Sequence, residues 1–345
     1  MSETAVTSAS IADLLAVAPP ERDKKWLREC LQAAVALELA TIPPYLYAYW
    51  SVRDASSELA DALLGIAWQE MLHMGLACNM LTAAEGKPSI VAAARAYPSR
   101  LPGGVRPGLV VPLKGVASGI ADPRDALKGF MDIEEPEKPV TPFAEGPTIG
   151  QFYKEIEKEL PAIADKYGFG GGVQVSGHIG GDILRRADTK ESALAAMRTI
   201  REQGEGTSAS PNGSTDPADR AHYYRFAEHW KGRRLQQLPP PHQDKWDFTG
   251  EAVERPALYP LGEVPAGGWE AAGDLRAALD DCNAAYGRLL GGLEALWSGP
   301  AAEKSVAEAM GVMGGMAQSA ARLIGLQKNS AGEIRGPEFR PVHRA

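Results

Sequence analysis

Two stretches in the first quarter of the chain repeat apolar side chains with the period of an α-helix. One runs from about residue 22 to 52, and the other runs from about 57 to 85, where Gly86-Lys87-Pro88 ends the pattern. We therefore predict two long helices, each with one buried face. A kink is expected where Pro43 and Pro44 interrupt the first helix, because each proline removes a helical hydrogen bond.

The helical period is lost between about residues 88 and 190. This region holds a short β-like run at 109–111, helical segments at 126–133 and 148–167, and a glycine-rich stretch at 168–181. The glycine-rich stretch lacks the spacing and the lysine of a P-loop, so we interpret it as a loop. An insertion of this length is too long for a structureless loop, and we predict that it packs as a cap on the helices.

Helical periodicity returns in the second half of the chain. Further helices are predicted at about 190–203, from about 217, at 270–297 and at 302–326, with a proline- and glycine-rich connector at 235–268. Residues 1–21 and 327–345 are expected to be tails. The fold is thus predicted to be mainly α, a single bundle domain over 22–326 with residues 88–190 as a mixed, loop-rich cap insertion.

Polar side chains interrupt the apolar faces of both N-terminal helices. Glu70 and His73 are three residues apart, so they project from the same face, and Glu38 lies in the apolar face of the first helix. Such groups are costly to bury unless something pairs with them, and neither face has Lys or Arg one turn away. A Glu that faces a Glu-x-x-His pair is half of a dimetal-carboxylate site in a helical bundle. The alternative is a surface pair, or a core histidine bonded to a carboxylate.

A second half-site is expected further along the chain. Glu202 and Glu205 lie at the end of the helix at 190–203, and Asp219 and His222 form a second acid-x-x-His pair. The order of these residues predicts metal ligands at Glu38, Glu70, His73, Glu202 or Glu205, and His222. Glu205, if it is not a ligand, is a candidate catalytic general base. In the alternative interpretation, Asp219 interacts with the helix dipole and His222 lies on the surface.

The composition is that of an ordinary soluble globular protein, with 44% hydrophobic and 23% charged residues in a chain of 345. A net charge of −8, with no basic cluster longer than Arg233-Arg234, argues against a nucleic-acid partner. No apolar run approaches the roughly 18 residues of a membrane span, and the N-terminus lacks a signal-peptide pattern. Three widely separated cysteines, Cys30, Cys78 and Cys282, fit reduced thiols, so a cytoplasmic protein is expected.

Five segments, taken in order, resemble the ferritin-like domains named for iminophenylpyruvate dimer synthase. They are residues 37–46, Glu70-Met71-Leu72-His73, Phe130-Met131-Asp132-Ile133-Glu134, Glu202-Gln203-Gly204-Glu205-Gly206 and His222-Tyr223-Tyr224-Arg225-Phe226. The resemblance covers roughly residues 25–325 and implies a ferritin-like helical bundle with a non-haem di-iron or related metal site. It implies ligand roles for Glu38, Glu70, His73, Glu202, Glu205 and His222, while Asp219 stands where ferritin-like proteins usually place Glu. Some relatives are associated with oxidative coupling of aromatic imino acids.

We hypothesise a non-haem dimetal oxidase or oxygenase. Its two metal ions, iron or alternatively manganese, would use O2 or peroxide to oxidise a small amino- or imino-acid-derived metabolite held under the 88–190 cap. The expected partner is this small-molecule substrate, with no membrane partner, and homo-oligomerisation stays open. Three alternatives remain: a metal-binding bundle without turnover, a bundle that has lost its metals, and a binding protein for an aromatic ligand.

Overall fold

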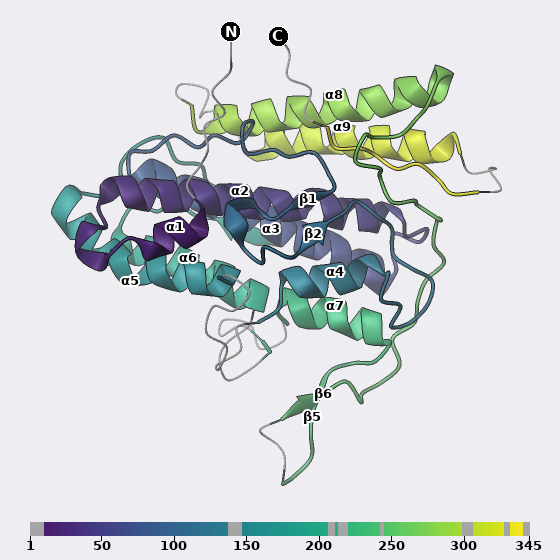
Figure 1. The fold of residues 1–345 in the computed structure, drawn as a ribbon, viewed down its shortest axis with the longest axis horizontal. Coiled ribbons are helices and arrows are strands. Elements are labelled where there is room, and N and C mark those ends of the chain that lie inside the picture. Colours follow the sequence, from purple (N-terminus) through teal and green to yellow (C-terminus); the bar gives the residue numbers. More distant parts are fainter. Residues whose placement is uncertain are drawn as a thin grey trace.

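Two long antiparallel helices, α2 (Lys24–Trp50) and α3 (Glu58–Ala83), form the central layer of the computed structural model (Figure 1). A second antiparallel pair, α8 (Gly273–Leu296) and α9 (Val306–Gly325), covers one face of this layer. The structure describes residues 10–136, 147–205, 211–212, 220–241, 245–298, 306–327 and 332–340.

Four shorter helices cover the other face of the central layer in two pairs. One pair is α5 (Ile149–Tyr167) with α6 (Lys190–Glu205), and the other is α4 (Ala126–Ile133) with α7 (His222–Lys231). Each pair covers about half of the layer, so the ends of the four helices meet over its middle (Figure 1). The helices agree with the predicted ones to within a few residues, with the largest difference at α7, which begins at His222 rather than near residue 217.

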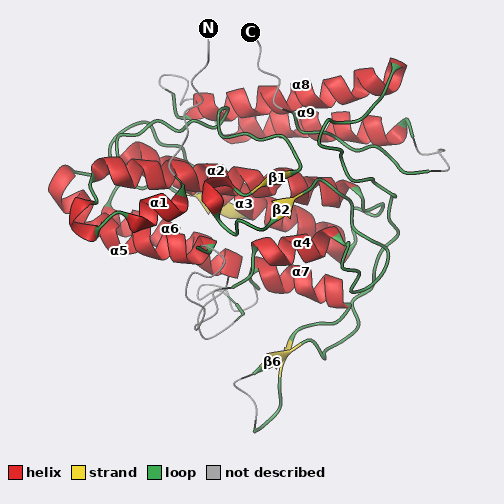
Figure 2. Ribbon diagram, in the orientation of Figure 1, coloured by secondary structure: helices red, strands yellow, loops and turns green. Residues whose placement is uncertain are grey.

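The remaining regular elements are short, and the strands pair into three two-stranded antiparallel sheets among the described residues (Figure 2). The mainly helical prediction is therefore confirmed. The short helices are α1 (Ile11–Ala16), η1 (Pro19–Glu21) and η2 (Pro102–Gly104), and the strand pairs are β1 (Ser99–Arg100) with β2 (Val110–Val111), β3 (Gly177–Ile179) with β4 (Asp182–Leu184), and β5 (Gln236–Gln237) with β6 (Trp246–Asp247).

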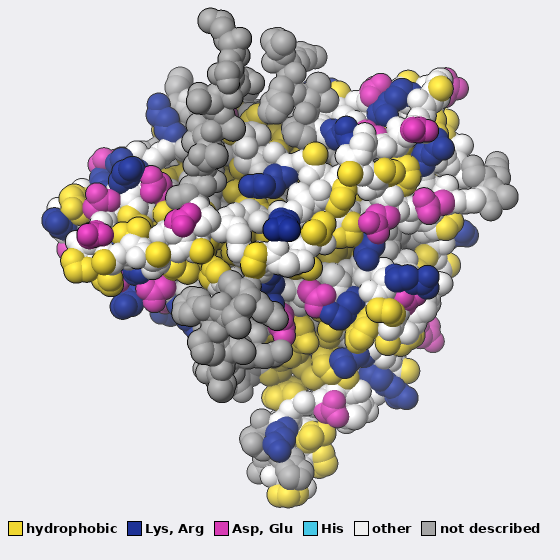
Figure 3. Space-filling model, in the orientation of Figure 1, with side chains coloured by type: hydrophobic (Ala, Val, Ile, Leu, Met, Phe, Trp, Pro, Cys, Tyr) yellow, Lys and Arg dark blue, Asp and Glu magenta, His cyan; other side chains and the backbone are white. Residues whose placement is uncertain are grey.

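The surface and the cysteines agree with the composition. Acidic and basic side chains are interspersed over the face drawn in Figure 3. Within the described part of the chain, no helix has both the length and the apolar character needed to cross a bilayer. Cys30, Cys78 and Cys282 are free and buried, and burial raises the pKa of the Cys282 thiol to about 12. Thiols of this kind stay protonated and unreactive at neutral pH.

Helix α2 continues through Pro43 and Pro44, and a side chain replaces one of the two backbone donors that the prolines lack. Pro44 has no N–H to donate to the carbonyl of Ala40, four residues earlier. The hydroxyl of Tyr97, which is buried, donates to that Ala40 carbonyl at 2.8 Å. The region that follows α3 therefore supplies a hydrogen bond that the proline sequence of α2 removes, close to the helical turn that carries Glu38.

Substituting Tyr97→Phe is expected to lower the free energy of unfolding by about 1–3 kcal/mol, because the Ala40 carbonyl would be left buried without a donor. Urea denaturation measures the difference. Tyr49→Phe is the matched control, since the Tyr49 hydroxyl has no hydrogen bond among the described residues, and it is expected to change little. Equal effects of the two substitutions would contradict a specific role for the Tyr97 hydroxyl.

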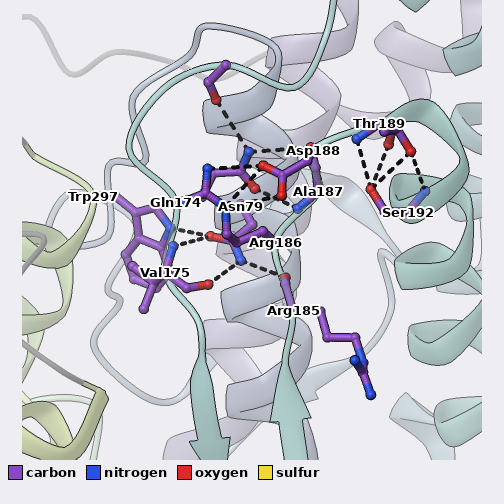
Figure 4. Close-up of polar contacts among 11 residues, drawn as sticks. Asn79, Gln174, Val175, Arg185, Arg186, Ala187, Asp188, Thr189, Ser192 and Trp297 are labelled. Carbon is purple, nitrogen blue, oxygen red and sulfur yellow. Dashed lines mark hydrogen bonds and ion pairs between the residues drawn. The ribbon is translucent and has the colours of Figure 1, made fainter.

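A buried asparagine on α3 fastens the β3–β4 hairpin and the end of α8 to the central layer (Figure 4). Asn79 is fully buried, and its amide nitrogen donates to the carbonyls of Val175 and Arg185 at 2.7 and 2.8 Å. Its amide oxygen accepts from the Val175 N–H and from Trp297 Nε1, both at 2.9 Å. One side chain thus joins three segments, and all four of its hydrogen-bonding positions are used.

The region predicted as a C-terminal tail includes packed residues. Phe339 is buried and stacks on Trp50 of α2, with ring centroids 5.6 Å apart. Glu338 is also buried and accepts hydrogen bonds from the Trp269 N–H, Asn283 Nδ2 and Arg276 Nη2. Residues 332–340 therefore cover the side of the molecule where α8 lies against α2.

Candidate metal centre

Five buried side chains converge where the ends of the shorter helices meet over α2 and α3. Glu38 comes from α2, Glu70 and His73 come from α3, Glu134 directly follows α4, and His222 begins α7. Their ligand atoms form two groups, each spanning less than 4.8 Å: Glu38, Glu70 and His73 in one, and Glu70, Glu134 and His222 in the other. Glu70 belongs to both groups, so it lies between the two half-sites.

Both histidines present Nδ1 to the carboxylates and use Nε2 elsewhere. His73 Nδ1 lies 3.7 Å from Glu38 Oε2 and 3.7 Å from Glu70 Oε1. His222 Nδ1 lies 2.8 Å from Glu70 Oε1 and 3.8 Å from Glu134 Oε2. An imidazole that binds a metal through one nitrogen needs the proton on the other, so Nδ1 is the candidate ligand atom in both residues.

Two glutamine amides fix that proton on Nε2. Gln203 Oε1 lies 2.8 Å from His73 Nε2, and Gln69 Oε1 lies 3.1 Å from His222 Nε2. An amide oxygen only accepts, so each Nε2 must donate. Arg225 Nη1 donates to the same Gln69 oxygen at 2.9 Å, which keeps that oxygen, rather than the amide nitrogen, turned toward the ring. When the imidazoles are neutral, as metal ligands must be, the lone pair of each Nδ1 is thereby directed at the carboxylates.

Each of the three carboxylates accepts a hydrogen bond from a hydroxyl group on one oxygen, and its other oxygen faces the cluster. Tyr153 donates to Glu38 Oε1 at 2.5 Å, Tyr45 donates to Glu134 Oε1 at 2.5 Å, and Thr41 Oγ1 donates to Glu70 Oε2 at 2.8 Å. The oxygens that face the two imidazoles are Glu38 Oε2, Glu134 Oε2 and Glu70 Oε1. Three oxygens and two nitrogens therefore converge, each held by a separate partner.

The electrostatics of the cluster favour a bound cation. Burial raises the pKa of Glu70 well above its usual range, and the charges of Glu134 and Glu38 raise it further. Burial also opposes ionisation of Glu38, but the hydrogen bond and the charge of His73 hold the Glu38 pKa below its usual value. Burial lowers the His73 pKa less than Glu38 and Glu70 raise it, so its pKa lies above the ordinary value. Glu70 and His73 thus favour protons at positions where a metal cation would compensate the carboxylates instead.

A buried nitrogen without a hydrogen-bond partner further supports a bound metal pair. His222 Nδ1 is buried and has no hydrogen-bond partner within the described residues, although Glu70 Oε1 lies only 2.8 Å away. With the proton on Nε2, these two atoms can lie this close only with a proton or a metal cation between them, and a bound cation would displace the proton that the raised pKa of Glu70 favours. Carboxylate oxygens with imidazole nitrogens are a donor set suited to iron, manganese or zinc. The cluster could therefore hold a pair of metal ions.

Metal binding is expected to weaken as the pH falls. Below its raised pKa, Glu70 carries a proton that a cation must displace, so the apparent affinity should rise with pH until that pKa is passed. Titration calorimetry with Mn(II) in buffers of different ionisation enthalpy measures both the affinity and the proton release. Glu29→Gln, at an exposed carboxylate of α2, is the control. An affinity independent of pH, with no proton released, would contradict this charge state.

Four of the sequence-predicted ligands meet in this cluster: Glu38, Glu70, His73 and His222. Glu202 is half-buried and belongs to neither group of ligand atoms, and it is the adjacent Gln203 that reaches His73. The side chain of Glu205 and all of Asp219 lie outside the described residues. Helix α7 begins at His222, so this histidine opens the helix, whereas the sequence predicted a helix start near residue 217.

Sequence reasoning missed Glu134. It follows the amphipathic segment 126–133 and opens an acidic, proline-bounded run, which has the composition of a solvated loop. The signal that could have found it is its place in the Phe130–Glu134 segment, directly after a helix whose apolar side is strongly defined. In the structure Phe130 lies against Tyr45, the residue whose hydroxyl binds Glu134.

A small cavity of about 20 Å³ adjoins the cluster, with room for little more than one water molecule. Its walls come from α2, α3, the end of α4, the start of α5 and the end of α6. The lining residues are Leu37, Glu38, Thr41, Glu70, His73, Ile133, Glu134, Ile149, Gly150, Tyr153, Ile200, Arg201 and Gly204.

Comparisons with known proteins agree with this architecture. The chain is similar over 90% of its length to a crystal structure of a ferritin-like protein from Caulobacter vibrioides, with a TM-score of 0.59, 19% sequence identity and 97% of that chain covered. This likeness supports the fold, and no curated protein matches the sequence. A family model described as ferritin-like matches residues 31–230, a segment that is more than half of the chain and includes all five residues of the cluster. The chain therefore belongs to the ferritin-like family.

Proposed function

We propose that this protein is a non-haem dimetal oxidoreductase that uses O2 or peroxide on a small organic metabolite. The observation that carries the proposal is the sharing of Glu70 between two buried groups of three ligands each. One ion would be held by Glu38, His73 and Glu70, and the other by Glu134, His222 and Glu70. Iron is the preferred metal, with manganese as the alternative, because the donors are oxygen and nitrogen.

The bound metals would supply the redox chemistry, and the chain supplies position and protection. Tyr153, Tyr45 and Thr41 hold the three carboxylates in fixed orientations, so little rearrangement is needed when charge changes at the site. Gln69 and Gln203 keep both imidazoles in the ligand tautomer. The apolar side chains around the cavity, among them Leu37, Ile133 and Ile200, exclude bulk water from the cluster.

The proposed substrate class is an amino- or imino-acid-derived, aromatic metabolite of a biosynthetic pathway in the cytoplasm. This part rests on the resemblance of five segments, including the Glu70–His73 and His222–Phe226 segments, to the iminophenylpyruvate dimer synthase type of ferritin-like domain. The test is O2 consumption by protein reconstituted anaerobically with Fe(II), with and without an aromatic 2-imino acid generated in place from its amino acid. Substrate-dependent uptake that is lost in His73→Ala would support the proposal. No uptake by fully metallated protein would contradict it.

One observation favours a second candidate, a metal-binding bundle that turns over no organic substrate. The cavity beside the cluster measures about 20 Å³, which is far smaller than any aromatic metabolite. A store or carrier of metal needs only this much space. The same oxygen measurement separates the two functions, because the second candidate takes up O2 only until its Fe(II) is oxidised, at one O2 for two or four Fe(II), and is indifferent to organic additives.

A further inference from the structure

Among the described residues that line the cavity beside the cluster, Arg201 is the sole lysine or arginine. It lies near the end of α6, between Ile200, which also lines the cavity, and the turn whose Gln203 reaches His73. The side chain is 23% exposed. A guanidinium in this position faces the same space as three of the cluster's carboxylates and must have a partner for each buried N–H, or lose free energy.

The hydrogen bonds of Arg201 are incomplete. Its Nη1 pairs with Glu157 Oε2 of α5 at 3.2 Å, while its Nε is buried and has no partner within the described residues. Arg106 and Arg255 also have an unpaired buried Nε, but neither lines the cavity. Glu157 takes Nη1, so the buried Nε–H, on the edge that a guanidinium forms from Nε and Nη2, is the donor left for another acceptor. Two parallel N–H groups on such an edge match the two oxygens of a carboxylate.

With two metal ions bound, the site would carry a net positive charge, which favours binding of an anion. Two divalent cations would exceed the charge of Glu38, Glu70 and Glu134 by one, and Arg201 adds a positive charge whose one ion-pair partner among the described residues is Glu157. The adjoining walls are apolar and screen little of this charge. A small anionic group that entered the cavity would meet both the metal pair and the Arg201 Nε–H, which has no partner among the described residues.

We propose that Arg201 binds the carboxylate of the substrate, so that an anionic substrate enters carboxylate first and its apolar body remains toward the cavity opening. This inference rests on the proposed function for the identity of the ligand as a substrate. The small cavity agrees with this orientation, because about 20 Å³ leaves no room for the whole of an aromatic acid and lets at most its carboxylate end approach the cluster. Arg201 is thus a specificity-determining residue, selecting carboxylates over neutral analogues.

The test is titration calorimetry of the metal-loaded protein with acetate and phenylacetate, with phenylacetamide as the neutral match and inorganic phosphate as the competing oxyanion. The wild type is expected to bind both carboxylates and to discriminate against phenylacetamide. Arg201→Gln is expected to weaken carboxylate binding by about tenfold or more, since a charge-assisted hydrogen-bonded pair is lost. Arg201→Lys keeps the charge but not the fork and is expected to lie between the two.

Arg198→Gln is the matched control, because Arg198 is exposed on the same helix and does not line the cavity. Circular dichroism and metal content establish that each variant is folded and loaded. Carboxylate affinity unchanged in Arg201→Gln, absence of carboxylate binding to the wild type, or a preference for phosphate over acetate would each overturn the proposal.

The carboxylate-binding role of Arg201 and the proposed oxidase function can fail independently of each other. Arg201-dependent carboxylate binding without substrate-dependent O2 uptake would leave the anion site in place and remove the oxidase. Turnover of a carboxylate substrate with the same KM in wild type and Arg201→Gln would retain the oxidase and remove this role of Arg201.

Discussion

Replacing Glu70 by alanine is expected to empty both metal positions, whereas Glu38→Ala and Glu134→Ala should each empty one. Glu70 is the ligand shared by the two groups, while Glu38 and Glu134 belong to one group each. Elemental analysis of purified protein reads this out as metal per chain, falling from about two to near zero for Glu70→Ala and to about one for the other two variants. Exposed Glu29→Ala is the control and should retain the wild-type content.

The free energy of unfolding of the same variants tests whether metal is lost because the shared carboxylate is removed. Without metal, three carboxylates share a buried site, and Glu70 is the least readily ionised of those whose pKa is displaced. Removing Glu70 should therefore cost the metal-free protein little or even stabilise it, while it removes the stabilisation that metal gives the wild type. Metal content that persists in Glu70→Ala would show that the ions are held elsewhere.

The largest expected loss of stability follows from Asn79→Leu, a substitution outside the cluster. It leaves the Val175 N–H, the Val175 and Arg185 carbonyls and Trp297 Nε1 without their buried partner. At roughly 1 kcal/mol or more for each hydrogen bond, the free energy of unfolding should fall by about 4 kcal/mol. Because small domains are stable by only about 5–15 kcal/mol, a loss of that size should be visible as poor expression or early melting.

Urea denaturation of metal-free protein measures this loss, so that metal binding does not obscure it. Thr82→Val, one turn further along α3, is the matched control, since its hydroxyl bonds only within the helix, to the Cys78 carbonyl at 2.9 Å. It should change the stability by less than about 1 kcal/mol. An Asn79→Leu variant as stable as Thr82→Val would mean that the hairpin and α8 are held to α3 by apolar packing alone.

The part of the site carried by α2 and α3 could be predicted because its signal is local. Glu70 and His73 share a helix face at a spacing of three, and Glu38 lies in an apolar stripe, so burial and proximity follow from helical periodicity. The long helices could be predicted equally well from the sequence, since their periodicity extends over several turns. The structure brings these three residues together as that reasoning requires.

The rest depended on contacts between distant segments. Glu134 reaches the cluster because α4 ends where α7 begins, and no local spacing records that meeting. Gln69 and Gln203 set the histidine tautomers from positions that carry no acidic or basic signal, so a search for ligand types passes over them. The start of the helix that carries His222 was predicted about five residues too early, because the apolar pattern alone does not show where α7 begins.

The most direct test of the central claim is anomalous diffraction at the iron edge from a crystal of Fe(II)-loaded protein. Two peaks are expected, one bounded by Glu38, Glu70 and His73 and the other by Glu70, Glu134 and His222. Peaks confined to surface carboxylates, or one peak that leaves Glu134 and His222 without an ion, would contradict a dimetal centre built around Glu70.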